Sequence, residues 1–156
     1  MADIFSSCEL IELGVQIEVN GRDFYQELSS RAKDIKLREL FKFLAAEEGK
    51  HIGIFNEISE KQLCDKDKEF NRDEYFAYMN SLARNYVFTE RDTGKKEAIV
   101  IKDEKEGVEK AIGFEKDSIV FYEGMRKIVP EKKTVDLLIA QEKMHLKKLT
   151  EMLSEI

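Results

Sequence analysis

The feature that most constrains the fold is a pair of segments in which a glutamate and a histidine interrupt an apolar stripe. The segments are AAEEGKHIGIF at residues 45–55 and IAQEKMHLKKL at residues 139–149. Apolar residues flank each ExxH at alternating steps of three and four, which is typical of the core-facing side of an amphipathic helix. Each segment therefore predicts a helix that directs a carboxylate and an imidazole into a bundle. The two pairs are Glu48 with His51 and Glu142 with His145.

Most of the remaining chain is also predicted to be helical, because it is rich in Glu and Lys and contains a single proline. The predicted helices are Ile4–Ala32, Lys36–Lys61, Asp103–Val129 and Glu131–Glu155. The segment Gln62–Lys102 is too long for a plain loop, and its stretch DEYFAYMNSLARNYVF has the pattern of a short extra helix. The sequence thus predicts one all-α domain over residues 1–156: a ferritin-like four-helix bundle of two helical hairpins joined by a long crossover.

The first and third predicted helices match one another as the second and fourth do. Each carries one glutamate at the centre of its apolar stripe and a tyrosine seven residues later. The pairs are Glu18 with Tyr25 and Glu115 with Tyr122. The chain therefore has the pattern of a duplicated helical hairpin.

Counting from the turns predicts that the four central acids lie at one height. Glu18 and Glu48 are equidistant from Lys33, so antiparallel helices with equal rise bring them level. The same count about the second turn brings Glu115 and Glu142 level. Small residues beside the acids are expected to leave room around them. These residues are Gly14, Gly21, Ala45, Ala111 and Ser118.

Four carboxylates and two imidazoles gathered in a core are unfavourable by themselves, since like charges repel and desolvation disfavours ionisation. Two divalent cations offset the four negative charges. Mixed oxygen and imidazole donors suit iron or manganese, and zinc is also compatible. The set of two Glu plus two ExxH motifs is that of di-iron carboxylate bundles. The predicted metal ligands are Glu18, Glu48, His51, Glu115, Glu142 and His145.

Other residues near this set have simpler interpretations. The alternative to a metal site is a polar core in which a buried cation neutralises the acids, but only Arg22 adjoins a stripe, and it could serve Glu18 alone. Tyr25 and Tyr122 are core aromatics whose hydroxyls are candidates for hydrogen bonds to ligand carboxylates. Glu47 and Gln141 directly precede two of the acids and are expected at the edge or surface. Glu109 lies six residues before Glu115, too far along its helix to share the site.

The overall composition excludes several classes of partner. The formal charge is −6 and no basic stripe is present, so a nucleic-acid partner is not expected. No signal peptide or long apolar run occurs, which predicts a cytoplasmic protein with no membrane partner. Cys8 and Cys64 form no CxxC pair and are expected to be ordinary small side chains rather than a disulfide framework.

Four motifs together resemble the rubrerythrin-like branch of the ferritin-like superfamily, over essentially the whole chain. They are IEVNGRDFY, AAEEGKHIGIF, AIGFEKDSIVFY and IAQEKMHLKKL. The resemblance implies a non-haem site for two iron ions at the six positions given above. It also implies reduction of hydrogen peroxide, or of dioxygen, and a homo-oligomer that is a dimer or larger.

Two departures from that family pattern affect the expected activity. The chain lacks the rubredoxin domain of typical rubrerythrins, so electrons are expected from a separate donor such as a rubredoxin-type protein. Ser118 stands where typical members have an additional acid, three residues after Glu115. This makes the site more symmetric and closer to bacterioferritin-like oxidase centres. Ferrous-iron oxidation in iron handling, and a metal-binding bundle without catalysis, therefore stay open as alternatives.

Overall fold

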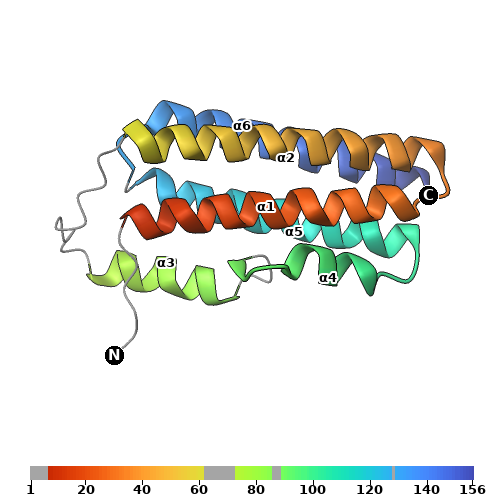
Figure 1. The fold of residues 1–156 in the computed structure, drawn as a ribbon, viewed down its shortest axis with the longest axis horizontal. Helices are drawn as coiled ribbons and strands as arrows, with labels where there is room; N and C mark the ends of the chain where they lie inside the picture. Colours follow the sequence, from red (N-terminus) through yellow and green to blue (C-terminus); the bar gives the residue numbers. More distant parts are fainter. Residues whose placement is uncertain (1–6, 62–72, 86–88, 128) are drawn as a thin grey trace.

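The computed structural model describes residues 7–61, 73–85, 89–127 and 129–156, and these residues are mostly helical (Figure 1). The helices are α1 (Ser7–Arg31), α2 (Ile35–Lys61), α3 (Asp73–Asn85), α4 (Thr93–Ile99), α5 (Glu104–Arg126) and α6 (Lys132–Glu155). The predicted ferritin-like bundle of two hairpins is confirmed. Helix α3 is the extra helix expected in the crossover, whereas α4 was not predicted. Residues 4–6, 86–88 and 128 of the predicted helices lie outside the described residues.

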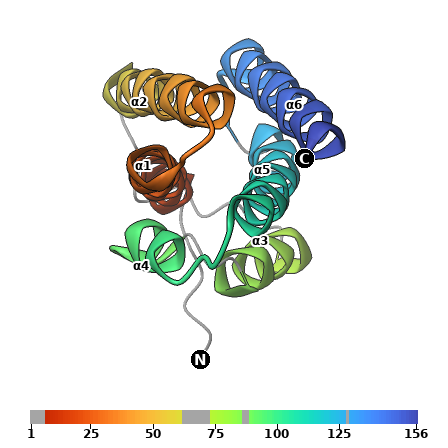
Figure 2. The same cartoon turned by 90° about the vertical axis from the view of Figure 1, so that its right-hand side faces the viewer.

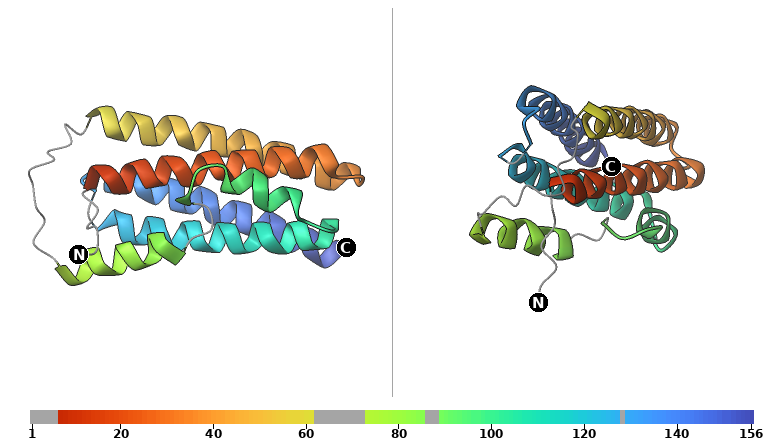
Figure 3. Two further views of the ribbon diagram at one scale, coloured as in Figure 1. Left: turned by 60° about the horizontal axis from the view of Figure 1, so that its bottom comes forward. Right: turned by 60° about the vertical axis from the view of Figure 1, so that its left-hand side comes forward.

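The two hairpins form the bundle and the crossover helices cover one side of it. Helices α1 and α2 pack together along their length, as do α5 and α6, more extensively than the hairpins pack on each other. Viewed end-on, α2 and α6 form one layer, α1 and α5 the next, and α4 and α3 the third (Figure 2). Helix α4 lies along α1 and α3 lies against α5 (Figure 3). The described crossover helices thus cover the side of the bundle remote from α2 and α6.

Side-chain caps set several helix ends. The Asp34 carboxylate accepts a hydrogen bond from the backbone N–H of Leu37 at 3.1 Å, which satisfies a free donor at the start of α2. Asp103 does the same for Glu106 at 2.8 Å at the start of α5. Helix α5 ends at Arg126, before the predicted end at Val129. The residue before a proline is biased away from helical geometry, and Pro130 follows Val129.

Helix α4 forms because α1 holds it. Asn20 is fully buried and donates from its amide to the Glu90 carbonyl at 2.7 Å. A Cβ on Gly94 would lie 1.9 Å from the Asn20 carbonyl oxygen, so only glycine permits this approach of the two backbones. The guanidinium of Arg31 donates to the carbonyls of Ala98, Ile99 and Ile101 at the end of α4. A cation beside the carbonyls at the C-terminal end of a helix is favourable.

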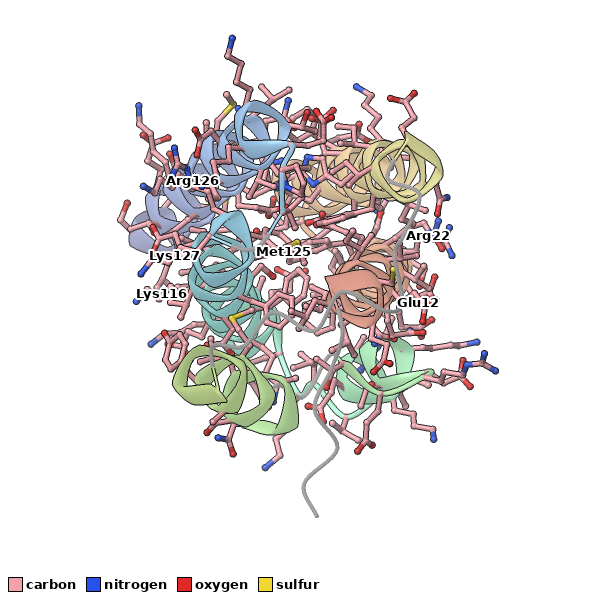
Figure 4. All side chains as sticks on the ribbon, turned by 90° about the vertical axis from the view of Figure 1, so that its left-hand side faces the viewer. Glu12, Arg22, Lys116, Met125, Arg126 and Lys127 are labelled. Carbon is pink, nitrogen blue, oxygen red and sulfur yellow. The ribbon has the colours of Figure 1, made fainter. Side chains whose placement is uncertain are left out.

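The apolar stripes fill the interior while charged side chains stay outside. The end view shows Arg22 and Lys116 projecting outward and Met125, which is fully buried, pointing between the helices (Figure 4). No helix within the described residues is long and apolar enough to cross a membrane. Cys8 is buried, as expected for a small side chain. Cys64 lies outside the described residues.

Candidate metal centre

The structure brings all six predicted site residues together in the middle of the bundle. Each is at most 1% exposed, and they come from all four long helices. The residues are Glu18 on α1, Glu48 and His51 on α2, Glu115 on α5, and Glu142 and His145 on α6. Glu109 is exposed and lies 3.9 Å from Lys105 on its own helix, so it is excluded from the cluster as expected.

The six side chains form two overlapping sets of four. In each set, one nitrogen or oxygen atom per residue lies within 4.8 Å of the corresponding atoms of the others. The first set, called here the His51 position, consists of Glu18, Glu48, His51 and Glu142. The second, the His145 position, consists of Glu48, Glu115, Glu142 and His145. Glu48 and Glu142 belong to both sets, so each would be shared by two ions bound there, and they are called here the bridging glutamates.

The two histidines present the same ring nitrogen to these carboxylates. Nδ1 of His51 lies 2.8 Å from Glu142, 3.2 Å from Glu48 and 3.3 Å from Glu18. Nδ1 of His145 lies 3.4 Å from Glu142 and 3.7 Å from both Glu48 and Glu115. The rings stack with their centroids 5.6 Å apart. The two sets therefore match in composition, and the His51 position is the more closely assembled.

The hydrogen-bond inventory tests whether these residues suit metal ions. Buried polar atoms are nearly always hydrogen-bonded, so exceptions require an explanation. Among the described residues, eight buried side-chain nitrogen and oxygen atoms have no hydrogen-bond partner, and all eight belong to the six-residue cluster. They include both Nδ1 atoms and both oxygens of each bridging glutamate, Glu48 and Glu142. Two sets of lone-pair donors without partners, facing one another, fit a pair of cations.

The charges of the cluster are poorly matched without cations. Burial, and then repulsion by Glu142, raise the pKa of both Glu48 and Glu115 well above the usual carboxyl range. Burial opposes ionisation of Glu142 as well, but its close approach to Glu115, His145 and His51 holds its pKa below the usual range. Metal-free protein therefore holds protons here that a cation must displace on binding.

The pKa values of both histidines are raised, whereas burial alone would lower them. Burial lowers the pKa of a histidine, but for His145 the carboxylates of Glu115 and Glu142 outweigh it and raise the pKa to about 9. The carboxylates beside His51 raise the pKa of that group further. Among the described residues, no lysine or arginine pairs with the cluster. Arg22 instead donates to Asp23 at 3.2 Å, so it does not neutralise Glu18.

Each tyrosine reaches across to the other hairpin. The hydroxyl of Tyr25 on α1 donates to Glu115 on α5, and the hydroxyl of Tyr122 on α5 donates to Glu18 on α1. Each bond occupies one oxygen, Oε1, of a non-bridging glutamate, while the other oxygen, Oε2, has no hydrogen-bond partner. Burial and the adjacent carboxylates raise the pKa of both tyrosines, so they remain donors at neutral pH. The predicted hydrogen bonds to the site carboxylates are therefore present.

Aromatic rings occupy the space that small residues were expected to leave open. A Cβ on Gly21 would lie 2.6 Å from the Phe114 ring, and one on Gly14 would lie 2.8 Å from the Phe55 ring. The glycines thus admit rings that surround the cluster with apolar groups. Ser118 is also buried, and its hydroxyl donates to the Phe114 carbonyl at 3.0 Å rather than to the site. Position 118 therefore supplies no carboxylate to the site, whereas typical rubrerythrins have an additional acid there.

Sequence reasoning missed one contact of the site. Gln141, expected at the edge or surface, is half-buried, and its Oε1 lies 2.7 Å from Nε2 of His51. A helix turns each residue about 100° from the last, so the residue before Glu142 flanks the seam rather than pointing away from it. The signal in the sequence was the match between Gln141 and Glu47, each directly before a bridging glutamate.

The fold and the two bridged donor sets define a ferritin-like four-helix bundle of the di-iron carboxylate class. The family model described as Rubrerythrin matches residues 9–153, and the chain belongs to the rubrerythrin family. Its structure is similar to the crystal structure of a Thermotoga maritima protein described as ferritin-like and diiron-carboxylate. That similarity has a TM-score of 0.75 and 30% sequence identity, and it covers 99% of each chain. No curated protein matches the chain.

Proposed function

We propose that the protein is a non-haem di-iron oxidoreductase that reduces hydrogen peroxide, or dioxygen, with electrons from a separate donor protein. The observation that carries the proposal is the group of eight buried donor atoms without hydrogen-bond partners, arranged as two sets that share Glu48 and Glu142. The description of the Thermotoga maritima relative as a diiron-carboxylate protein supports iron as the metal.

The charge and chemistry of the donors favour two ferrous ions. Four carboxylates balance two divalent cations, and the carboxylate and imidazole donors suit iron. Manganese and zinc accept the same donors, so the experiment below must separate redox-active from redox-silent metals. The non-bridging ligands would be Glu18 with His51 for one ion and Glu115 with His145 for the other.

Bound at these residues, two ferrous ions would supply two electrons which, with two protons, convert one hydrogen peroxide molecule into two waters and leave the ions ferric. The carboxylates hold negative charge where positive charge rises during that oxidation. Tyr25 and Tyr122 fix the two non-bridging glutamates across the bundle. The rings of Phe55 and Phe114, which lie against Gly14 and Gly21, place apolar groups beside the cluster.

The burial of the site favours a small substrate. All six side chains are at most 1% exposed, which suits peroxide or dioxygen better than an organic molecule. A cavity of about 550 Å³ does exist, but it lies at the α1–α2 turn, where its lining includes Leu28, Ala32, Ile101 and Glu104. None of the six cluster residues lines it. We therefore give it no part in the reaction.

Ser118 favours a second candidate, the oxidation of ferrous iron by oxygen in iron handling. The additional acid of typical rubrerythrins allows one iron to exchange a carboxylate for a histidine as its charge changes. Here the Ser118 hydroxyl is bonded to its own helix, and His51 already faces the cluster beside Glu18. His51 would then be a permanent ligand, and the site would resemble a symmetric oxidase centre.

The first experiment is an anaerobic ferrous titration of metal-free protein, followed by one equivalent of hydrogen peroxide with the visible spectrum recorded. We expect saturation near two irons per chain and prompt appearance of ferric absorption. Stoichiometric uptake without oxidation by peroxide would contradict the peroxidase proposal. A lack of stoichiometric iron binding would remove the enzyme proposal altogether.

Turnover separates the candidates that survive this titration. Repeated peroxide consumption with a rubredoxin-type reductant, and with both irons retained, is expected for the peroxidase. Ferric product that leaves the site, followed by renewed ferrous uptake, would instead support iron oxidation. A preparation that binds zinc and excludes iron would support a binding or structural bundle.

A further inference from the structure

The duplicated hairpins differ at the two residues that lie behind the histidines. Glu47 on α2 and Gln141 on α6 occupy equivalent places, each directly before a bridging glutamate, and both are half-buried. One side chain is an anion and the other a neutral amide. This difference affects the two positions because the rings of His51 and His145 each turn Nδ1 toward the carboxylates, which leaves Nε2 for an outer partner.

Gln141 fixes the ring of His51. The Oε1 atom of Gln141 is a carbonyl oxygen and can only accept, so Nε2–H of His51 donates across the 2.7 Å that separates the two atoms. When the proton is on Nε2, the neutral ring carries its lone pair on Nδ1. That atom faces Glu18, Glu48 and Glu142, as a metal-binding nitrogen would.

Glu47 makes no equivalent bond to His145. Its carboxylate accepts from Nζ of Lys50 at 2.7 Å, one turn further along α2. An oxygen of Glu47 comes within 4.8 Å of a ring nitrogen of each histidine, but no direct hydrogen bond joins it to His145 in the described residues. On α6 the place of Lys50 is taken by Met144, whose thioether offers no such donor, so Gln141 remains available to His51.

The distances within the two positions agree with this difference. Nδ1 of His51 lies within 3.3 Å of three carboxylates, whereas Nδ1 of His145 lies at least 3.4 Å from each of its three. The outer side of His145 meets the ring of Phe43 edge-on, with the centroids 6.2 Å apart. A ring held in its binding orientation loses less freedom when it binds an ion.

We propose that Gln141 is a positioning residue that preorganises the His51 position, so that this position takes up the first metal ion. The His145 position fills second and with lower affinity. This inference rests on the proposed function only in requiring that the two sets bind metal. It concerns the order of binding and is independent of the oxidant and the electron donor.

The test is a titration of metal-free protein with Co²⁺, in which the d–d absorption and the bound metal per chain are both recorded. Wild-type protein is expected to bind in two steps, the first at least about tenfold tighter. Gln141→Leu is expected to weaken the first step by about 10- to 100-fold, which is the usual effect of removing an outer partner of a ligating histidine. Gln141→Glu keeps an accepting oxygen and is expected to restore two separate steps.

Three further variants identify the position and control for structural damage. Glu18→Ala should remove the tight step, whereas Glu115→Ala should retain it, because each lacks a ligand of one position only. Met144→Leu changes a half-exposed side chain on α6, one residue from His145, and should leave both steps intact. The melting temperature of each metal-free variant separates lost binding from lost folding.

Several outcomes would overturn the inference. Two steps unchanged in Gln141→Leu, or both steps weakened equally, would mean that Gln141 does not position His51. Two Co²⁺ ions bound with equal affinity by wild-type protein would overturn the order of filling while leaving the proposed function in place. A chain that binds neither cobalt nor iron would overturn both.

Discussion

The two hairpins of this chain place the same polar residues inside the bundle and differ outside it. Within, each supplies a central glutamate, an ExxH pair and a tyrosine that bonds the other hairpin's non-bridging glutamate. Outside, α1 is covered by α4 and α5 by α3, and the turns are tied by unrelated contacts. Arg38 donates to the Ala32 carbonyl at the first turn, whereas Arg126 pairs with Asp136 beside the second.

This difference shows at which positions the structure restricts the choice of residue most strongly. In the core, each carboxylate loses water and must find a compensating charge or donor, so a change in one hairpin would leave a group in the other without its partner. On the surface, water and salt compensate for almost any exchange. Gln141 and Glu47 are half-buried and lie at the boundary between the core and the surface. At this boundary the residue types of the two hairpins begin to differ.

The largest effect is expected from removing one non-bridging glutamate. Glu115→Ala takes one ligand from the His145 position and should leave at most one ion per chain. Glu18→Ala should do the same from the other hairpin. Metal content after an anaerobic ferrous titration measures both, and Glu109→Ala is the matched control because Glu109 is exposed on the same helix as Glu115. Loss of paired binding in Glu109→Ala, with retention in Glu115→Ala, would mean that α5 is assigned the wrong register.

The next effect concerns the close backbone contact by which α4 covers α1. Gly94→Ala would bring a methyl group 1.9 Å from the Asn20 carbonyl oxygen, and the backbones must separate. We expect a loss of about 1–3 kcal/mol in the free energy of unfolding. Urea denaturation measures it.

Gly113→Ala on α5 is the control for that substitution. No heavy atom lies within 4 Å of the added Cβ, and alanine is a better helix former, so a gain of roughly 0.5–1 kcal/mol is expected. Equal responses of the two variants would show that α4 does not need close contact with α1.

A smaller effect is expected at the tyrosines, where the hairpins should respond alike. Tyr25→Phe and Tyr122→Phe each remove a hydroxyl that orients a non-bridging glutamate. Both variants should still bind two ions, with affinity about tenfold weaker, because outer partners tune a site rather than form it. Loss of one ion in either variant would mean that the tyrosine itself is required for binding. Equilibrium dialysis against iron or cobalt measures the change.

The smallest effects should come from the turns, where the hairpins differ most. Arg38→Ala removes a charged donor from the Ala32 carbonyl and should lower the free energy of unfolding by about 0.5–1.5 kcal/mol. Arg126→Ala breaks an exposed ion pair with Asp136 and should leave the urea midpoint unchanged at physiological salt. A larger loss in Arg126→Ala than in Arg38→Ala would reverse this order.

The sequence sufficed for the bundle and for the composition of the cluster because both depend on helical periodicity. Few arrangements stabilise an acid in an apolar stripe, and fewer still stabilise four such acids at one height. Glu48 and Glu142 could therefore be assigned to the centre without knowledge of how the helices pack. The turns were located for the same reason, to within a few residues.

What the sequence did not indicate depends on contacts between distant segments. The segment TGKKEAI of α4 is short and polar, and it is helical because Asn20 and Arg31 hold it, which no local pattern reveals. The role of Gln141 depends on the distance between α2 and α6.

The sharing of donors between the two positions has a mechanical consequence. Each position takes three residues from one hairpin and one from the other, so neither half of the chain supplies a complete set by itself. The hairpins pack on each other less extensively than the helices within each hairpin. Ions bound at Glu48 and Glu142 would thus act as removable cross-links between two halves that the crossover alone joins covalently along the backbone. The stiffness of the joint between the halves would then follow the supply of metal.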